Sequence, residues 1–486
     1  MGMHQPAGKR FRRGNVAAIA VRTISLAAAL STIGCGNQYR PVVSAIGPVG
    51  PAGQPTKYAV AVSNPCPILA PTCGSPGLAT MVDFSGDTVI TTPQILTDPS
   101  YFVLNPTGVQ GYTINAQGSL NTFLLSASLI TSNVVQTTLP VNSAPVSITS
   151  LTPASAVSTI FIPETDSNSI AAINSGSAAL YDNVKIVNAT NPVYVVGASG
   201  TPRVYAISQN TPGSLGQIDS LEAISTTTLS DSAQMPVGIM PVYGVMTSDD
   251  RRAFILNQGS GTVSVINVPS NAPDVNLPTI TIPPIAIAGG GTTAPNPVWA
   301  DLSPVDTDLV VLNQGDKIHP GTLSIISIPL CNPNAQANNP NCSATNPVDA
   351  VGFGTIVATA TVGINPTMVS VLQDGTAAYV INQLDGTGTC GAGEGSVTVV
   401  NLLTGTIPAT ICGVSGTAAT ASANATSNVI FGHPNSVSAT QGTPTGKVYI
   451  TSADNTYLSV IYTDTNTVQT HISLQGLGLR VLVTVP

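Results

Sequence analysis

The hydrophobic positions of this chain fall in short runs, and polar stretches rich in glycine, asparagine and aspartate separate them. Four segments, 251–271, 308–329, 376–406 and 446–467, each give an apolar run, a polar loop, a second apolar run and a turn. Weaker copies of this plan begin at Val109, Ser158 and Pro202. Short apolar or alternating runs bounded by turn residues are typical of β-hairpins. We therefore expect an all-β protein.

A proline recurs in front of these units. Seven predicted inner strands each begin at such a proline, namely Pro99, Pro145, Pro192, Pro241, Pro297, Pro366 and Pro434. In five units a β-favouring residue of the second strand follows thirteen residues later: Tyr112, Tyr205, Phe254, Val310 and Tyr379. Proline cannot donate a ladder hydrogen bond and is tolerated at a strand's first residue, so it marks where each strand begins. A period of roughly 45 to 70 residues is typical of β-propeller blades.

Two strand pairs resemble the YVTN-type repeat of bacterial β-propellers. They are 378–382 (AYVIN) with 396–401 (SVTVVN), and 448–451 (VYIT) with 458–461 (LSVI). The resemblance covers most of residues 57–486 and implies one propeller of four-stranded antiparallel blades. Relatives of this superfamily include lactonase-like, dehydrogenase-like and surface-layer-type proteins, and they commonly have seven blades. The resemblance therefore predicts the fold but little about function.

The number of blades depends on how the two ends of the chain pair. Three predicted strands near the start (58–65, 77–84 and 88–95) have no proline-led inner strand of their own, and 477–484 (LGLRVLVT) can supply it. The segment 41–46 (PVVSAI) is a competitor. Pairing the N- and C-terminal strands would close the ring and remove exposed strand edges. We favour eight blades over seven.

The first 34 residues resemble a bacterial lipoprotein signal peptide. A basic start that includes Lys9 and Arg10 precedes the apolar segment 24–34, and STIGC resembles a lipobox with Cys35 as the lipidated residue. Plain secretion and a twin-arginine signal are the alternatives. Residues 35–56 then form a Pro/Gly-rich tether, and 57–486 the propeller. In this class of lipoprotein, an aspartate directly after the lipidated cysteine retains the protein in the inner membrane. Position 36 is glycine, so we expect an outer-membrane lipoprotein on the periplasmic face or the cell surface.

The cysteine count agrees with export. Without Cys35, six of the seven cysteines remain, and they fall into three local pairs: Cys66 with Cys73, Cys331 with Cys342, and Cys390 with Cys412. Six cysteines formally allow 15 connectivities, but short separations favour the local set. We predict three disulfides and an oxidising compartment. No C-x-x-C occurs, so these cysteines do not predict a metal site.

Charge argues against nucleic acid as a partner. After the predicted signal peptide, nine basic residues stand against 22 acidic ones, a net charge of −13. Phosphate binding needs clustered lysine or arginine. The only adjacent basic pair there, Arg251 and Arg252, follows Asp249 and Asp250, which predicts a charged hairpin turn.

Candidate chemistry is sparse. The chain has no G-x-S-x-G, H-E-x-x-H, P-loop or EF-hand motif. Its three glutamates stand in different repeats, and we predict that its histidines at 319 and 433 lie in loops or where strands begin. The single tryptophan, Trp299, follows Pro297 and is expected in the core or as a ligand contact at the channel mouth. We predict no cofactor and no metal.

These features favour a monomeric, lipid-anchored binding or interaction scaffold for a protein, peptide or polysaccharide. The alternative is an envelope lactonase-like enzyme or other hydrolase at the channel mouth.

Overall fold

The chain divides into two units, Met1–Gln54 and Pro55–Pro486. The computed structural model describes residues 57–66, 73–115, 118–125, 134–151, 159–198, 203–225, 228–329, 350–414, 428–440 and 446–484, all in the second unit. The predicted signal peptide and tether, Cys35, Cys331, Cys342 and the segment 41–46 lie outside the described residues.

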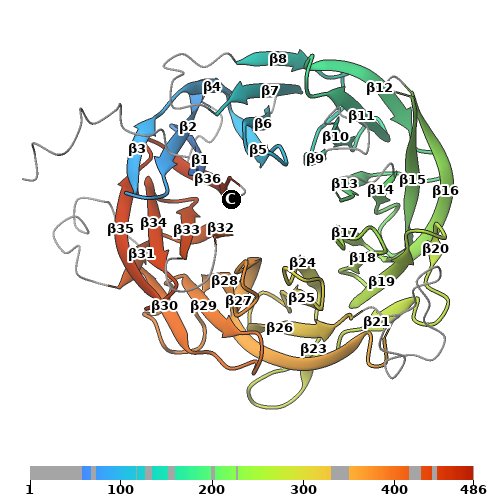
Figure 1. The fold of residues 1–486 in the computed structure, drawn as a ribbon. Coiled ribbons are helices and arrows are strands. Elements are labelled where there is room, and N and C mark those ends of the chain that lie inside the picture. Colours follow the sequence, from blue (N-terminus) through green and yellow to red (C-terminus); the bar gives the residue numbers. More distant parts are fainter. Residues whose placement is uncertain are drawn as a thin grey trace, which may run out of the picture. The chain divides into compact units, whose positions relative to one another are not determined.

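Every regular element in the described residues is a strand, and the antiparallel sheets follow one another round a ring (Figure 1). The predicted all-β propeller of four-stranded antiparallel blades is therefore confirmed. No described helix is long and apolar enough to cross a membrane.

We number the blades in chain order. Blade 1 contains β36 (Leu477–Val483), β1 (Tyr58–Asn64), β2 (Pro76–Asp83), β3 (Thr88–Thr91) and β4 (Gln94–Thr97). Blade 2 contains β5 (Pro99–Leu104), β6 (Gln110–Asn115), β7 (Ser119–Leu124) and β8 (Val135–Thr138). Blade 3 contains β9 (Thr149–Leu151), β10 (Thr159–Glu164), β11 (Ser169–Asn174) and β12 (Ala179–Lys185). Blade 4 contains β13 (Pro192–Val196), β14 (Arg203–Ser208), β15 (Leu215–Ser225) and β16 (Thr228–Ile239).

The second half of the ring follows the same plan. Blade 5 contains β17 (Pro241–Met246), β18 (Arg252–Asn257), β19 (Thr262–Asn267), β20 (Ala272–Pro273) and β21 (Thr279–Thr281). The short pair β22 (Ile285–Ala286) and β23 (Thr292–Thr293) precedes blade 6, which contains β24 (Pro297–Leu302), β25 (Asp308–Asn313), β26 (Pro320–Ser327) and the first part of β27 (Thr355–Val371). The rest of β27 begins blade 7, with β28 (Ala377–Leu384), β29 (Ser396–Asn401), β30 (Ala409–Val414) and β31 (Val429–Phe431). Blade 8 contains β32 (Pro434–Ala439), β33 (Lys447–Ser452), β34 (Tyr457–Tyr462) and β35 (Thr467–Ser473).

The last strand of the chain pairs with the first described one. β36 lies antiparallel to β1, with Ala59 opposite Val483 and Asn64 opposite Leu477. β36 is thus the innermost strand of blade 1, in the place that a proline-led strand takes elsewhere. This pairing leaves neither strand with a free edge on that side.

Five of the seven prolines begin a strand, as predicted, and two do not. Pro145 makes only an isolated bridge to Glu164, and β9 starts four residues later at Thr149. Pro366 lies inside the 17-residue β27, because that strand serves blade 6 and then blade 7. The prediction of a strand start was wrong at these two positions. At Pro366 the pairing with β28 shifts register, and proline is tolerated at such bulges.

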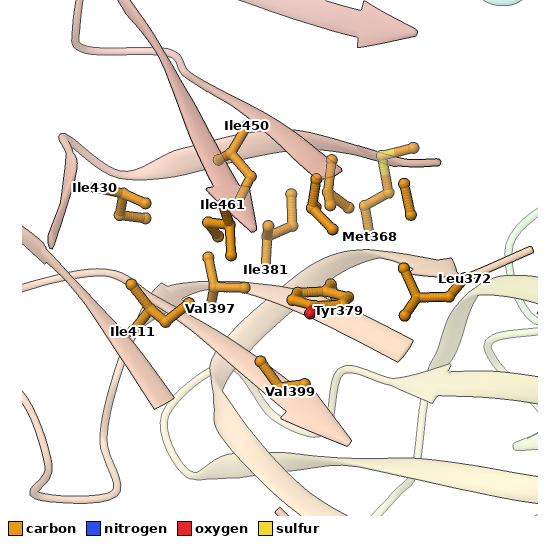
Figure 2. Packing of buried hydrophobic residues seen from close by; sticks show 13 residues of the cluster. Met368, Leu372, Tyr379, Ile381, Val397, Val399, Ile411, Ile430, Ile450 and Ile461 are labelled. Atoms are coloured by element: carbon orange, nitrogen blue, oxygen red, sulfur yellow. The ribbon is translucent and has the colours of Figure 1, made fainter. Parts of the chain in front are cut away.

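The hydrophobic core lies between neighbouring blades. The five residues thirteen positions after a proline are all fully buried. In Figure 2, Tyr379, Ile381 and Val397 of blade 7 face Ile450 and Ile461 of blade 8. The described apolar core is therefore divided into clusters that each lie between two neighbouring blades.

Polar contacts supplement this packing. The hydroxyl of Tyr379 donates to Asn466 of blade 8 at 2.5 Å, and that of Tyr449 donates to Asp87 of blade 1 at 3.1 Å. Lys447 also reaches Asp87, at 2.7 Å, and both of these charged side chains are 8% exposed. The blade 8 to blade 1 contact therefore includes a buried ion pair.

Two of the three predicted disulfides are present. Cys66 is bonded to Cys73, and Cys390 to Cys412. Each bridge anchors a loop between the second and third strands of its blade, blade 1 and blade 7 respectively.

The predicted charged turn between β17 and β18 also forms, and Arg251 pairs with Asp249. Arg252, however, is buried and pairs with Asp274 inside blade 5.

Candidate functional site

The residues two positions after the inner-strand prolines meet at the axis of the ring. In six inner strands the ladder shifts register between the proline and this residue, which is Tyr101, Tyr194, Tyr243, Trp299, Met368 or Ser436. A bulge re-aims side chains, and it recurs here at the same place in successive blades. One repeated irregularity therefore builds the axial lining.

Three of these aromatic rings lie in a row, a stack in which Tyr194 is tilted by 41° against Tyr243. The ring centroids of Tyr194 and Tyr243 are 4.6 Å apart, and those of Tyr243 and Trp299 are 4.2 Å apart with an interplanar angle of 16°. Burial raises the pKa of both tyrosines, so their hydroxyls stay neutral near pH 7. The stack joins blades 4, 5 and 6.

Arg480 of β36 supplies a positive charge beside this stack. Its guanidinium carbon lies 4.4 Å from the centroid of the Tyr101 ring and 5.6 Å from that of Trp299. Arginine attracted to ring faces in this way makes cation–π interactions. The guanidinium therefore links blade 1 to blades 2 and 6.

No described carboxylate forms an ion pair with Arg480. The described ion pairs involve other basic side chains: Arg203, Arg251, Arg252, His319, His433 and Lys447. The guanidinium hydrogen-bonds the side chain of Tyr101, which is neutral, while its buried Nε has no hydrogen-bond partner. A partly desolvated charge is costly unless it is paired, so this guanidinium is a ready partner for an anion.

A cavity of about 180 Å³ opens beside Arg480. It includes the two axial residues that are not aromatic, Met368 and Ser436, and its full lining comprises Ser100, Tyr101, Trp299, Thr367, Met368, Asn435, Ser436, Leu479 and Arg480. The hydroxyl of Thr367 is buried and has no hydrogen-bond partner. The cavity thus combines one cation with mainly apolar surface and a few uncharged polar side chains.

A second hollow of about 290 Å³ adjoins this cavity, since Ser100, Asn435 and Leu479 line both. Its lining also includes Asn64, Cys66 and Asp98. The hollow therefore lies where the inner strands begin, on the face of the ring that carries the Cys66–Cys73 bridge. Together the two spaces lead from that face to the guanidinium.

Asp301 is the acidic residue of the same inner strand as Trp299, two positions further on. Its Oδ2 accepts the N–H of Val371 at 2.8 Å and so joins blade 6 to blade 7. Burial raises its pKa to about 6, although the N–H groups of Val371 and Leu302 counteract the rise. This carboxylate is held by backbone and is not paired with Arg480.

The other residues considered from sequence lie apart. His319 lies in the loop before β26 and His433 directly before β32, as predicted. Glu222 pairs with Arg203, whereas Glu164 is buried and contacts Ser169 at 2.7 Å. In the described ranges no three His, Cys, Asp or Glu side chains gather as a metal site would require.

Trp299 is half-buried and lines the cavity, so it combines the two positions expected for it: it packs against the core and faces the axis. Arg480 and the three tyrosines were missed. The three tyrosines could have been found from their position two residues after a proline. A second signal is the aspartate or asparagine directly before the proline, which has positive φ and marks the bulge; it precedes Pro99, Pro192, Pro297 and Pro366.

Comparison with known proteins supports the fold. No protein-family model matches the chain, and no curated protein matches it. Among solved structures, dihydro-heme d1 dehydrogenase NirN in complex with DHE has a TM-score of 0.53 and 10% identity, covering 86% of this chain and 73% of that one. Two structures of AztD from Citrobacter koseri have TM-scores of 0.51 and, for the apo form, 0.50, with 8% and 10% identity, and each covers 88% of this chain and 97% of its own. At such identities the likeness shows the β-propeller fold alone.

Proposed function

We propose that this protein is a lipid-anchored binding protein of the bacterial cell envelope, whose axial cavity receives part of a peptide, protein or polysaccharide. The observation that carries the proposal is the Arg480 guanidinium, which has no acidic partner among the described residues, beside a cavity of about 180 Å³. Ligand sites combine apolar walls with a few convergent polar groups, and this cavity has that composition.

The anchor and the location belong to the same proposal. Lipid on Cys35 would hold the monomeric propeller at the outer membrane through the tether 35–56, on its periplasmic face or at the cell surface. Supporting this are the lipobox-like STIGC and two disulfides, which form in oxidising compartments.

Purification of the protein from envelopes, followed by native mass spectrometry, tests both parts. We expect a mature chain that begins at a lipid-bearing Cys35 and carries a co-purifying ligand. The single tryptophan lies in the cavity, so intrinsic fluorescence should change when that ligand is removed. A mature chain with an unmodified Cys35 would contradict the anchor, and fluorescence insensitive to every envelope fraction would contradict the site.

A hydrolase is the second candidate, and the pair of His433 and Asp454 favours it. Nδ1 of His433 lies 2.7 Å from Oδ2 of Asp454, an arrangement that can orient a general base. Its Nε2, however, lies 3.0 Å from the carbonyl oxygen of Gly393, so both ring nitrogens are engaged. Hydrolysis of simple lactones or esters that His433→Ala abolishes, with the fold intact, would establish this candidate instead.

A further inference from the structure

We infer that the axial cavity recognises the C-terminal carboxylate of a peptide whose last residue is aliphatic. This inference rests on the proposed function, because it names the ligand of the same site. Its premise is the guanidinium of Arg480, which lies against two aromatic rings and has no described acidic partner.

The guanidinium that lines the cavity defines the chemistry of the ligand. Arg480 carries a fixed positive charge and has only hydrogen-bond donors, so it calls for an anionic acceptor. Guanidinium and carboxylate match in geometry, because two N–H groups can meet two oxygens. A carboxylate satisfies the guanidinium, whereas a neutral amide leaves the positive charge uncompensated.

The walls favour an aliphatic body over a sugar ring. Sugars usually bind aromatic side chains through the ring face, but Tyr243 and Arg480 both already lie over the ring of Trp299. Arg480 likewise lies over Tyr101. The surfaces left for the ligand include Met368 and Leu479, and apolar side chains bury well against them.

The size of the cavity suits one terminal residue. A dry cavity of about 150 Å³ accommodates a benzene molecule, and this cavity has about 180 Å³. The adjoining hollow of about 290 Å³ leads away from it past Gly478, Ala453 and Cys66. An extended peptide could therefore place its last residue at Arg480 while the preceding residues run outward.

The test uses two matched probes on the full-length, lipid-bearing protein. One is acetyl-Gly-Gly-Leu with a free C-terminal carboxylate, and the other is the same peptide as its C-terminal amide. Titration of the Trp299 fluorescence measures the affinity for each. We expect the free acid to bind at least about tenfold more tightly than the amide, which corresponds to roughly 1.4 kcal/mol.

Variants localise the contact. Arg480→Lys retains a charge but loses the paired donors, so we expect roughly tenfold weaker binding of the free acid, and Arg480→Met should abolish detectable binding. Arg251→Met is the matched control, since that arginine is in an exposed turn of blade 5, and it should bind like wild type. Circular dichroism and thermal unfolding establish that each variant is folded.

The outcomes separate this inference from the proposed function. Equal affinity for the acid and the amide, or no binding of the acid at roughly 10 mM, overturns the carboxylate inference even if an envelope ligand still changes Trp299 fluorescence. Binding of a uronic acid oligomer in place of the peptide shows that the occupant is an acidic saccharide and also overturns it. Because the acid and amide are compared on wild-type protein, the test stands even if an Arg480 variant fails to fold.

Discussion

The contacts between blades and the lining of the axis are built from the same repeat, yet they differ in how far their residues vary. In five units the side chain thirteen residues after the proline is large or branched and fully buried. Two residues after the proline, it ranges from tryptophan and tyrosine to methionine and serine. In these five units the first position fills an interblade space, whereas the second faces an axis that need not be symmetrical.

The asymmetry of the axis is what creates a site. Blades 4, 5 and 6 contribute the stacked rings of Tyr194, Tyr243 and Trp299, while blades 7 and 8 contribute Met368 and Ser436. The cavity lies on the side with the smaller or more flexible residues. Regular positions hold the ring together, and departures from the repeat are where a ligand has room.

The largest stability effect is expected at the contact that closes blade 8 on blade 1. Lys447→Met removes the partner of Asp87 and leaves a buried carboxylate, so the free energy of unfolding should fall by about 3–5 kcal/mol. Denaturant unfolding measures the loss. Arg251→Met, which breaks an exposed pair, should cost at most about 1 kcal/mol. Equal losses in the two variants would mean that burial of the closing pair is unimportant.

Asp219 is a buried carboxyl group in β15, and its replacement by asparagine should stabilise the protein. Burial, helped by nearby Asp231 and opposed by a hydrogen bond from Gln217, raises its pKa to about 7 from 3.8. The folded protein therefore holds a proton that the unfolded chain releases, and wild type loses stability as pH rises from about 4 to 7. Asp219→Asn avoids this loss and should be more stable at pH 8 by about 2–4 kcal/mol.

The pH dependence makes this test specific. At pH 4 the Asp219→Asn variant and wild type should unfold at nearly the same temperature, because both then carry a neutral side chain. Thermal unfolding at pH 4, 6 and 8 measures the difference. A gain that is the same at all three values would show that titration of Asp219 is not its cause.

The regular positions of the repeat were predictable, and the irregular ones were not. The prolines, the residues thirteen positions later and the local cysteine pairs follow from spacing and strand chemistry. Pro366 was misplaced because β27 continues from blade 6 into blade 7, and no local signal separates one long strand from two. Hydrophobic alternation shows that a strand exists but not which blade it joins.

The site was harder to predict, because its residues come from distant strands. Arg480 stands in an apolar run, LGLRVLVT, where a single basic residue gives no motif. Its neighbours Tyr101 and Trp299 lie 379 and 181 positions earlier in the chain. Only closure of the ring brings them within cation–π distance. Trp299 was singled out because it is the single tryptophan, which is a weaker reason than its position after the proline.

Removal of the Cys66–Cys73 disulfide tests whether ligand binding depends on the loop that lines the hollow of about 290 Å³. Replacement of Cys66 and Cys73 by serine removes a bridge between residues seven positions apart, which should cost about 2–3 kcal/mol. Cys66 also lines the hollow, so binding of the acetylated peptide acid should weaken too. Replacement of Cys390 and Cys412 is the comparison, because neither lines the hollow. That variant should lose stability without losing affinity, and weakened binding in both would assign the effect to general destabilisation.

The smallest effect on stability is expected when a tyrosine between blades and a tyrosine at the axis are each replaced by phenylalanine. Tyr379→Phe removes a hydroxyl that bonds to the next blade, and the free energy of unfolding should fall by about 0.5–1.5 kcal/mol. Tyr101→Phe keeps the ring beside Arg480 and removes a hydroxyl that hydrogen-bonds the guanidinium at the cavity, where water can replace it, so stability should change by less than about 0.5 kcal/mol. Removal of the axial hydroxyl should instead be detected by Trp299 fluorescence and by affinity for the peptide acid, both of which Tyr379→Phe leaves unchanged. If Tyr101→Phe proved the more destabilising of the two, the axial tyrosine would have a structural role like that of the tyrosines between blades.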